Sequence, residues 1–157
     1  MNALDIAGLL RRLDDAQVEY VLIGAVALAA HGPVRATEDL DLVPDPDPEN
    51  LRKLGNLLVD MGAQLPTADA RSFGQEDRAA LAQGESLTLE TALGGLDVVQ
   101  RTEGVPSYLE LAAEALALEV FGITARVCSR HHLREMKLAR ATHRDLADVE
   151  DLDAIGS

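Results

Sequence analysis

The stretch from residue 21 to residue 43 constrains the fold of this chain more than any other. It begins with the apolar run Val-Leu-Ile, breaks at Gly24, and continues as an alanine-rich segment to residue 30. It then returns through Pro33 to a second apolar run that ends Leu-Asp-Leu-Val. Short apolar runs bounded by glycine or proline favour strands, whereas the alanine-rich segment favours a helix. The stretch therefore predicts a strand, a short helix and a second strand in close succession.

The second strand of this unit carries Asp39 and Asp41. Alternate residues of a strand face the same way, so both carboxylates project together while Leu40 and Leu42 point into the core. Two anions side by side repel each other unless a cation joins them. Because hard divalent cations prefer oxygen ligands, the pair predicts a Mg2+ site.

Gly24 predicts a second kind of site beside the first. Glycine permits a tight turn of the backbone, and the N–H groups at the beginning of the next helix favour an anionic phosphate. A metal site and a phosphate site on adjacent elements indicate nucleotide chemistry.

The bare Asp-x-Asp pattern has little value in a chain this acidic, because it occurs three times. Asp45 and Asp47 alternate with prolines, which predicts a turn or an extended loop. Asp151 and Asp153 lie in a helical pattern, where residues two apart face different sides. The pair at 39 and 41 is the one that combines strand periodicity with an upstream glycine turn.

This arrangement resembles the nucleotidyltransferase superfamily, which shares a Gly-Ser or Gly-Gly turn, an Asp-x-Asp pair on the next strand and a third carboxylate on a later strand. The run from Gly24 to Gly32, with Arg35 and Thr37 before the aspartates, is most similar to the compact bacterial branch around the abortive-infection toxins. The resemblance covers about residues 18–152. One departure is Ala25, where the superfamily has glycine or serine; a hydroxyl contact is lost, but the backbone N–H remains.

The resemblance implies an α/β (α+β) fold, with a mixed sheet flanked by helices and a C-terminal helix pair. It assigns the third carboxylate to Asp97, in the segment Gly-Gly-Leu-Asp-Val-Val. A lone aspartate after two glycines is also typical of a hairpin. The implied metal ligands are Asp39, Asp41 and Asp97, which would hold two Mg2+ ions, for which Mn2+ can substitute.

The end of the chain carries the second half of the resemblance. Lys137-Leu-Ala-Arg140, followed by Arg-Asp-x-x-Asp from residue 144, is similar to a segment of the same toxin-like branch. The resemblance implies that Lys137 is catalytic and holds the triphosphate. The implied nucleotide-binding residues are Gly24, Ala25, Arg35, Thr37, Arg140 and Asp148. The alternative is an exposed, salt-bridged helix pair, with Lys137 and Arg140 on neighbouring surface positions.

The implied activity is the transfer of NMP from an NTP, such as ATP, to a hydroxyl acceptor with release of pyrophosphate. Asp97 would help to hold the second metal ion and would orient or deprotonate the acceptor. Three classes stay open. In the first, the protein is a toxin that modifies tRNA or protein and has an antitoxin partner. In the second, it is an enzyme that modifies an aminoglycoside-like small molecule. In the third, it is a non-catalytic relative that binds nucleotide or protein. The last is conceivable because of Ala25.

Composition favours one domain, residues 1–157, with a real core, because 47% of the residues are hydrophobic. We expect a cytoplasmic protein with no membrane span, since the N-terminus lacks the basic region of a signal peptide and Cys128 is the lone cysteine. The formal charge of -13 argues against broad nucleic-acid binding. Cys128, His131 and His132 do not predict structural zinc, which requires four ligands.

The remaining periodicity predicts the order of the elements. The segment 66–85 is polar and predicts a mobile loop beside the site. The predicted helices are 3–16, 25–30, 47–61, 107–116, 130–141 and 144–155, and the predicted strands are 18–23, 40–43, 86–92, 96–100, 117–121 and 123–127.

The change Ala25→Ser tests the proposed phosphate turn. If residue 25 contributes only its backbone N–H, nucleotide affinity should stay within about tenfold of the parent, or improve by one added hydrogen bond. Isothermal titration with a non-hydrolysable ATP analogue measures this. Loss of binding in the variant would contradict the phosphate cradle.

Overall fold

The computed structural model describes residues 3–33 and 36–155 as alternating helices and strands. The helices are α1 (Ile6–Asp15), α2 (Gly24–Ala30), α3 (Pro48–Asp60), α4 (Gln75–Ala82), α5 (Tyr108–Glu114), α6 (Arg130–Arg140) and α7 (His143–Ile155). The strands are β1 (Tyr20–Ile23), β2 (Asp39–Pro44), β3 (Leu87–Thr91), β4 (Gly94–Val98), β5 (Leu116–Val120) and β6 (Ile123–Val127).

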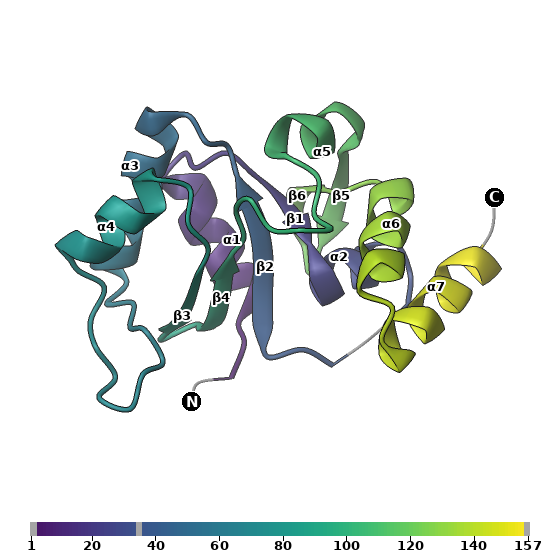
Figure 1. Cartoon of the computed structure of the whole chain (residues 1–157), viewed down its shortest axis with the longest axis horizontal. Coiled ribbons are helices and arrows are strands. Elements are labelled where there is room, and N and C mark those ends of the chain that lie inside the picture. Colours follow the sequence, from purple (N-terminus) through teal and green to yellow (C-terminus); the bar gives the residue numbers. More distant parts are fainter. Residues whose placement is uncertain (1–2, 34–35, 156–157) are drawn as a thin grey trace.

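The strands form one mixed sheet in the order β3-β4-β2-β1-β6-β5 (Figure 1). Strands β1 and β2 are antiparallel, as are the outer hairpins β3-β4 and β5-β6. The pairs β2-β4 and β1-β6 are parallel. The predicted mixed sheet flanked by helices is therefore confirmed, and so is the C-terminal helix pair.

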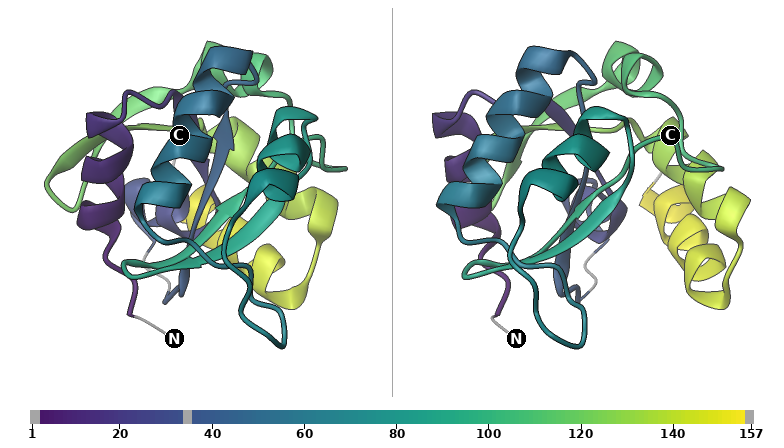
Figure 2. Two further views of the ribbon diagram at one scale, coloured as in Figure 1. Left: turned by 90° about the vertical axis from the view of Figure 1, so that its left-hand side faces the viewer. Right: turned by 60° about the vertical axis from the view of Figure 1, so that its left-hand side comes forward.

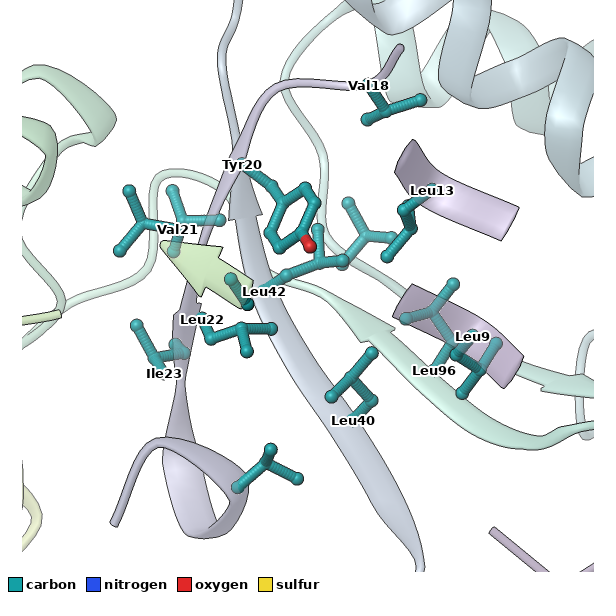
Figure 3. Packing of buried hydrophobic residues seen from close by; sticks show 14 of the residues in the cluster. Leu9, Leu13, Val18, Tyr20, Val21, Leu22, Ile23, Leu40, Leu42 and Leu96 are labelled. Atoms are coloured by element: carbon teal, nitrogen blue, oxygen red, sulfur yellow. The ribbon is translucent and has the colours of Figure 1, made fainter. Parts of the chain in front are cut away.

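Helices cover both faces of the sheet. Helices α1, α3 and α4 lie on one side, and the α6-α7 pair lies on the other (Figure 2). On the first side, Leu9 and Leu13 of α1 face leucines of the central strands in a fully buried core (Figure 3). Leu40, Leu42 and Leu96 are at most 1% exposed. Because strand side chains alternate, the residues between these leucines face the α6-α7 side.

The segment 66–85 differs from its prediction as a loop, because residues 75–82 form α4. This helix is weakly amphipathic, and one leucine, Leu81, is its buried apolar anchor. Its first turn is fixed by Asp77, whose carboxylate accepts from the Gly74 N–H (2.9 Å) and from the Arg71 guanidinium (2.7 Å). These contacts lie outside the hydrophobic pattern, so periodicity alone missed the helix.

In the part of the chain that the structure describes, every helix is too short or too polar to cross a lipid bilayer.

Candidate active site

The register of β2 and β4 gathers three carboxylates. Asp41 is directly opposite Asp97, and Asp39 is opposite Gly95, in the parallel β2-β4 pair. All three aspartates occupy the alternate positions to the buried leucines and so face the α6-α7 side of the sheet. Asp97 therefore lies within strand β4 of the β3-β4 hairpin and not in the hairpin turn. The structure places it beside the two aspartates of β2.

Two glycines leave the space that these carboxylates occupy. A Cβ atom added to Gly95 would lie 1.8 Å from Oδ1 of Asp39. A Cβ atom added to Gly24 would lie 2.2 Å from Oδ2 of Asp41, and the φ of +73° at Gly24 is itself one that side chains disfavour. Both positions exclude any residue with a side chain unless an aspartate moves. Gly24 therefore has a steric role at the carboxylates as well as its role in the turn.

Crowding and burial disfavour the charged forms of the aspartates on β2. Burial, followed by the contact with Asp97, raises the pKa of Asp41 to about 7. The nearby Arg140 guanidinium opposes this rise in the Asp41 pKa but does not cancel it. The pKa of Asp39 is also raised, first by burial and then by the charge of Asp97. Without a cation, the site therefore holds its negative charge at a cost in free energy.

The donor set fits a hard divalent cation. Oδ1 of Asp41 and Oδ1 of Asp97 are buried, and neither has a hydrogen-bond partner among the described residues. Buried carboxylate oxygens without partners are costly unless an ion binds them. The described groups whose ligand atoms already lie within 4.8 Å of one another do not include this triad.

Helix α6 places a buried cation over the same face. The Lys137 side chain is only 9% exposed, and its Nζ lies 3.1 Å from Oδ2 of Asp148 and 3.6 Å from Oδ1 of Asp145. Both carboxylates come from α7. A buried charge must be paired and hydrogen-bonded, so this contact fixes the position of the ammonium group.

Arg140 extends this network. Its Nε and Nη2 each donate to the Asp145 carboxylate at 2.8 Å. The Thr142 hydroxyl donates to the same carboxylate at 2.6 Å, at the turn between α6 and α7. The Arg140 hydrogen bonds and those from Thr142 lower the pKa of Asp145 well below its usual range. The helix pair is thus held by charge-assisted hydrogen bonds at its closed end.

The alternative of an exposed helix pair, with Lys137 on its surface, was wrong. Lys137, Asp145 and Asp148 are each at most 7% exposed, because the faces of α6 and α7 that carry them pack against each other. Asp145 was not among the predicted site residues, although it contacts both Lys137 and Arg140. Its position in the Arg-Asp-x-x-Asp segment was the available signal.

Two adjoining pockets open beside the carboxylates. They share Gly24, Asp41, Lys137 and Arg140. The first, here called the apolar pocket, has a volume of about 670 Å³. Its other lining residues are Ile23, Asp97, Val99, Thr102, Glu103, Gly104, Val105, Leu133, Met136 and Ala139.

The second, here called the polar pocket, has a volume of about 520 Å³. Its other lining residues are Ala25, Ala36, Thr37, Glu38, Asp39, Arg144 and Asp148. Neither pocket includes a residue of the segment 66–85, so the prediction that this segment lies beside the site was wrong.

The structure also places the remaining predicted residues. Thr37 shapes the chain before β2: its hydroxyl donates to the Asp39 carbonyl at 3.0 Å and accepts from the Asp39 N–H at 3.2 Å. Arg35 lies outside the described residues. Arg144, which sequence reasoning did not select, donates to the Ala36 carbonyl at 3.0 Å and so joins α7 to the chain that leads into β2.

Comparison with known proteins finds similar structures but no similar sequence. No protein-family model matches the sequence, and no curated protein matches it. The fold is similar to that of the lincosamide antibiotic adenylyltransferase LnuA bound to lincomycin, with a TM-score of 0.66 and 16% identity over 98% of this chain and 99% of that one.

Two further solved structures share the fold. One is ANT(2")-Ia in complex with adenylyl-2"-tobramycin, with a TM-score of 0.62 and 16% identity over 95% of this chain and 86% of that one. The other is an antigenic nucleotidyltransferase-like protein from Paracoccidioides brasiliensis, with a TM-score of 0.56 and 17% identity over 96% of this chain and 72% of that one. At these identities the similarity establishes a nucleotidyltransferase-like fold.

The change Gly95→Ala tests whether this glycine positions Asp39. The added methyl group must displace the Asp39 carboxylate, so stabilisation by Mg2+ should require at least roughly tenfold more metal than in the parent. Thermal unfolding at increasing Mg2+ concentrations measures this. Gly74→Ala is the matched control, because the nearest atom to its added Cβ is 3.9 Å away. A variant that responds to Mg2+ as the parent and the control do would remove the steric role.

The raised pKa of Asp41 predicts a pH dependence of stability in protein freed of divalent metal. The folded state keeps the Asp41 proton up to about pH 7, whereas the unfolded state releases it near the ordinary value of 3.8. The free energy of unfolding should therefore fall as the pH rises between these values. Denaturant unfolding of the parent and of Asp41→Asn measures this contribution as the difference between the two curves. Asp145 titrates below this window, and parallel curves would disprove the assignment.

Proposed function

We propose that the protein is a Mg2+-dependent nucleotidyltransferase. The observation that carries the proposal is the meeting of Asp39, Asp41 and Asp97 on one face of β2 and β4, with two buried oxygens that lack hydrogen-bond partners within residues 3–33 and 36–155. A fold shared with adenylyltransferases supports it. The three aspartates would hold two divalent ions, with Mn2+ able to replace Mg2+. When bound, these ions supply the positive charge that neutralises the triphosphate and the leaving pyrophosphate.

The polar pocket suits the triphosphate of the nucleotide. Gly24 and Ala25 begin α2 at one wall of this pocket, and Arg144 and Lys137 provide positive charge at the other. The beginning of a helix favours an anion, and cations close to the phosphates stabilise negative charge as it develops. Asp145 and Asp148 hold Lys137 in place, so their role in this proposal is to position the cation.

The apolar pocket suits the acceptor. In the proposed reaction, an acceptor hydroxyl attacks the α-phosphorus of ATP in line, so a new O–P bond forms as the bond to pyrophosphate breaks. Asp97 lines this pocket, orients the hydroxyl and receives its proton. The two adjoining pockets would therefore bring the donor and the acceptor together at Asp41, which lines both of them.

The pocket and the overall charge favour a small cationic acceptor. The apolar pocket combines aliphatic side chains, such as Leu133 and Met136, with the carboxylate of Glu103. A net charge of -13 attracts cations and opposes the approach of RNA. Lys137 and Arg140 already pair with acidic groups of α7. We therefore propose a hydroxylated, amine-bearing small molecule, and the tobramycin and lincomycin of the structural neighbours supply suitable probes.

Transfer of label from α-³²P-ATP tests the activity and the acceptor class together. The purified protein is incubated with Mg2+ and, separately, with tobramycin, lincomycin, tRNA and a bacterial extract. We expect label on a small molecule. Label on tRNA or protein would instead support the toxin-like alternative, with an antitoxin partner, that the α6-α7 sequence suggests. ATP binding without transfer to any acceptor would favour the non-catalytic alternative.

Asp41→Asn is the variant that links transfer to the carboxylates. It removes a charge from a repulsive cluster, so we expect it to fold, and we expect turnover to fall by at least about 100-fold. Asp60→Asn, an exposed change at the end of α3, is the control. Lys137→Ala is a poorer test, because it leaves Asp148 buried without its ammonium partner and threatens folding itself. Equal turnover in parent and Asp41→Asn would exclude this site.

A further inference from the structure

A second group of metal-ligand side chains lies where α5 meets α6, apart from the carboxylates on β2 and β4. Glu114 is the last residue of α5, and His131 and His132 lie in the first turn of α6. Each of the three offers one ligand atom, and these atoms all lie within 4.8 Å of one another. None of the three lines the apolar or the polar pocket.

The distances fit an ion shared by the three side chains. Nδ1 of His131 lies 3.0 Å from Oε1 of Glu114, and Nε2 of His132 lies 3.5 Å from Oε2. Two ligands that are each about 2.1 Å from a tetrahedral ion lie about 3.4 Å apart, so the second distance is that of two ligands of one ion. The first is the distance of a hydrogen bond between His131 and Glu114.

The surroundings hold the ligands in place. The Ser129 hydroxyl, which caps α6, donates to the Glu114 carboxylate at 2.8 Å. The other ring nitrogen of His131 lies 3.7 Å from Glu135, and carboxylates are common partners of the outer nitrogen of a ligand histidine. The His132 side chain is buried, at 10% exposed. Its Nδ1 is buried and lacks a hydrogen-bond partner in the described part of the chain.

We propose that Glu114, His131 and His132 bind one transition-metal ion of the Zn2+ type. Two imidazole nitrogens and one carboxylate oxygen are a zinc ligand set, and water completes the tetrahedron because Glu114 and His131 are exposed. Glu114 also supplies the negative charge that a dication requires at the beginning of a helix. Mg2+, which prefers oxygen ligands, does not suit this set.

Cys128 does not belong to this site. It is fully buried, and its Sγ is not among the ligand atoms that lie within 4.8 Å of one another. The sequence contains two neighbouring histidines of the site but does not indicate the third ligand, because Glu114 is 17 residues away from His131 and contacts it only in the folded protein.

An ion at this position would connect two parts of the chain that line the apolar pocket. Helix α5 follows the segment that contributes Thr102, Glu103 and Val105 to the apolar pocket, and α6 contributes Leu133 and Lys137. An ion at their junction fastens two walls of that pocket to each other. Bound Zn2+ therefore stabilises the folded protein independently of nucleotide chemistry.

Titration with Zn2+ alone tests the proposal. The experiment uses protein that carries Asp39→Asn and Asp41→Asn, so that the carboxylate triad does not compete for the ion. We expect Zn2+ to bind and to raise the midpoint of thermal unfolding. Glu114→Gln and His131→Gln should each weaken binding by roughly tenfold or more. Mg2+ at the same concentration should not bind.

The variants Glu114→Gln and His131→Gln remove ligands without disturbing the core. Both changes are at exposed positions, so they do not threaten folding as a change of buried His132 does, and circular dichroism without metal checks this. His143→Gln, an exposed histidine that begins α7, is the matched control and should bind Zn2+ unchanged. The proposal is wrong if Glu114→Gln and His131→Gln bind Zn2+ as tightly as this control. Because no step involves ATP, such a failure leaves the proposed activity untouched.

Discussion

The mutual repulsion of three carboxylates is the constraint on which the rest of the site depends. Asp39, Asp41 and Asp97 are fixed on adjacent parallel strands, so their backbone positions cannot move apart without breaking the β2-β4 register. The protein accommodates them sterically at Gly24 and Gly95. The nearby Arg140 guanidinium does not offset the repulsion between the carboxylates, because the pKa of Asp41 stays raised. In the proposed activity, binding of a divalent cation would remove this cost and would so gain free energy from it.

The α6-α7 pair solves the opposite problem, which is to keep positive charge in a partly apolar pocket. Lys137 is buried, and burial of an unpaired ammonium group would be prohibitive. Asp145 and Asp148 make that burial possible, and Asp145 also fixes Arg140 through two hydrogen bonds. The position of these cations thus depends on acidic residues of α7 rather than of the sheet. The two halves of the site meet through Arg140, whose charge acts on Asp41.

Much of this arrangement could be predicted from the sequence, because it depends on residues that are close together in the chain. The unit of strand, short helix and strand follows from Gly24 and the apolar runs around it, and Asp39 and Asp41 share a face because of strand alternation alone. Prediction failed where the deciding contacts are not periodic. Helix α4 depends on Arg71, Asp77 and a single buried leucine, and the burial of Lys137 depends on which faces of α6 and α7 meet. A hydrophobic pattern contains neither kind of contact.

The sequence by itself determined the order of most elements, the acidic pair and the kinds of ligand available, because these depend on neighbours within a few residues. Only the tertiary structure decided the register that sets Asp97 opposite Asp41, the need for glycine at position 95, and the meeting of Glu114 with two histidines. The physical reason is the same in each case. These contacts join segments that are far apart in the chain, and their distances follow from the packing of whole strands and helices rather than from any local preference.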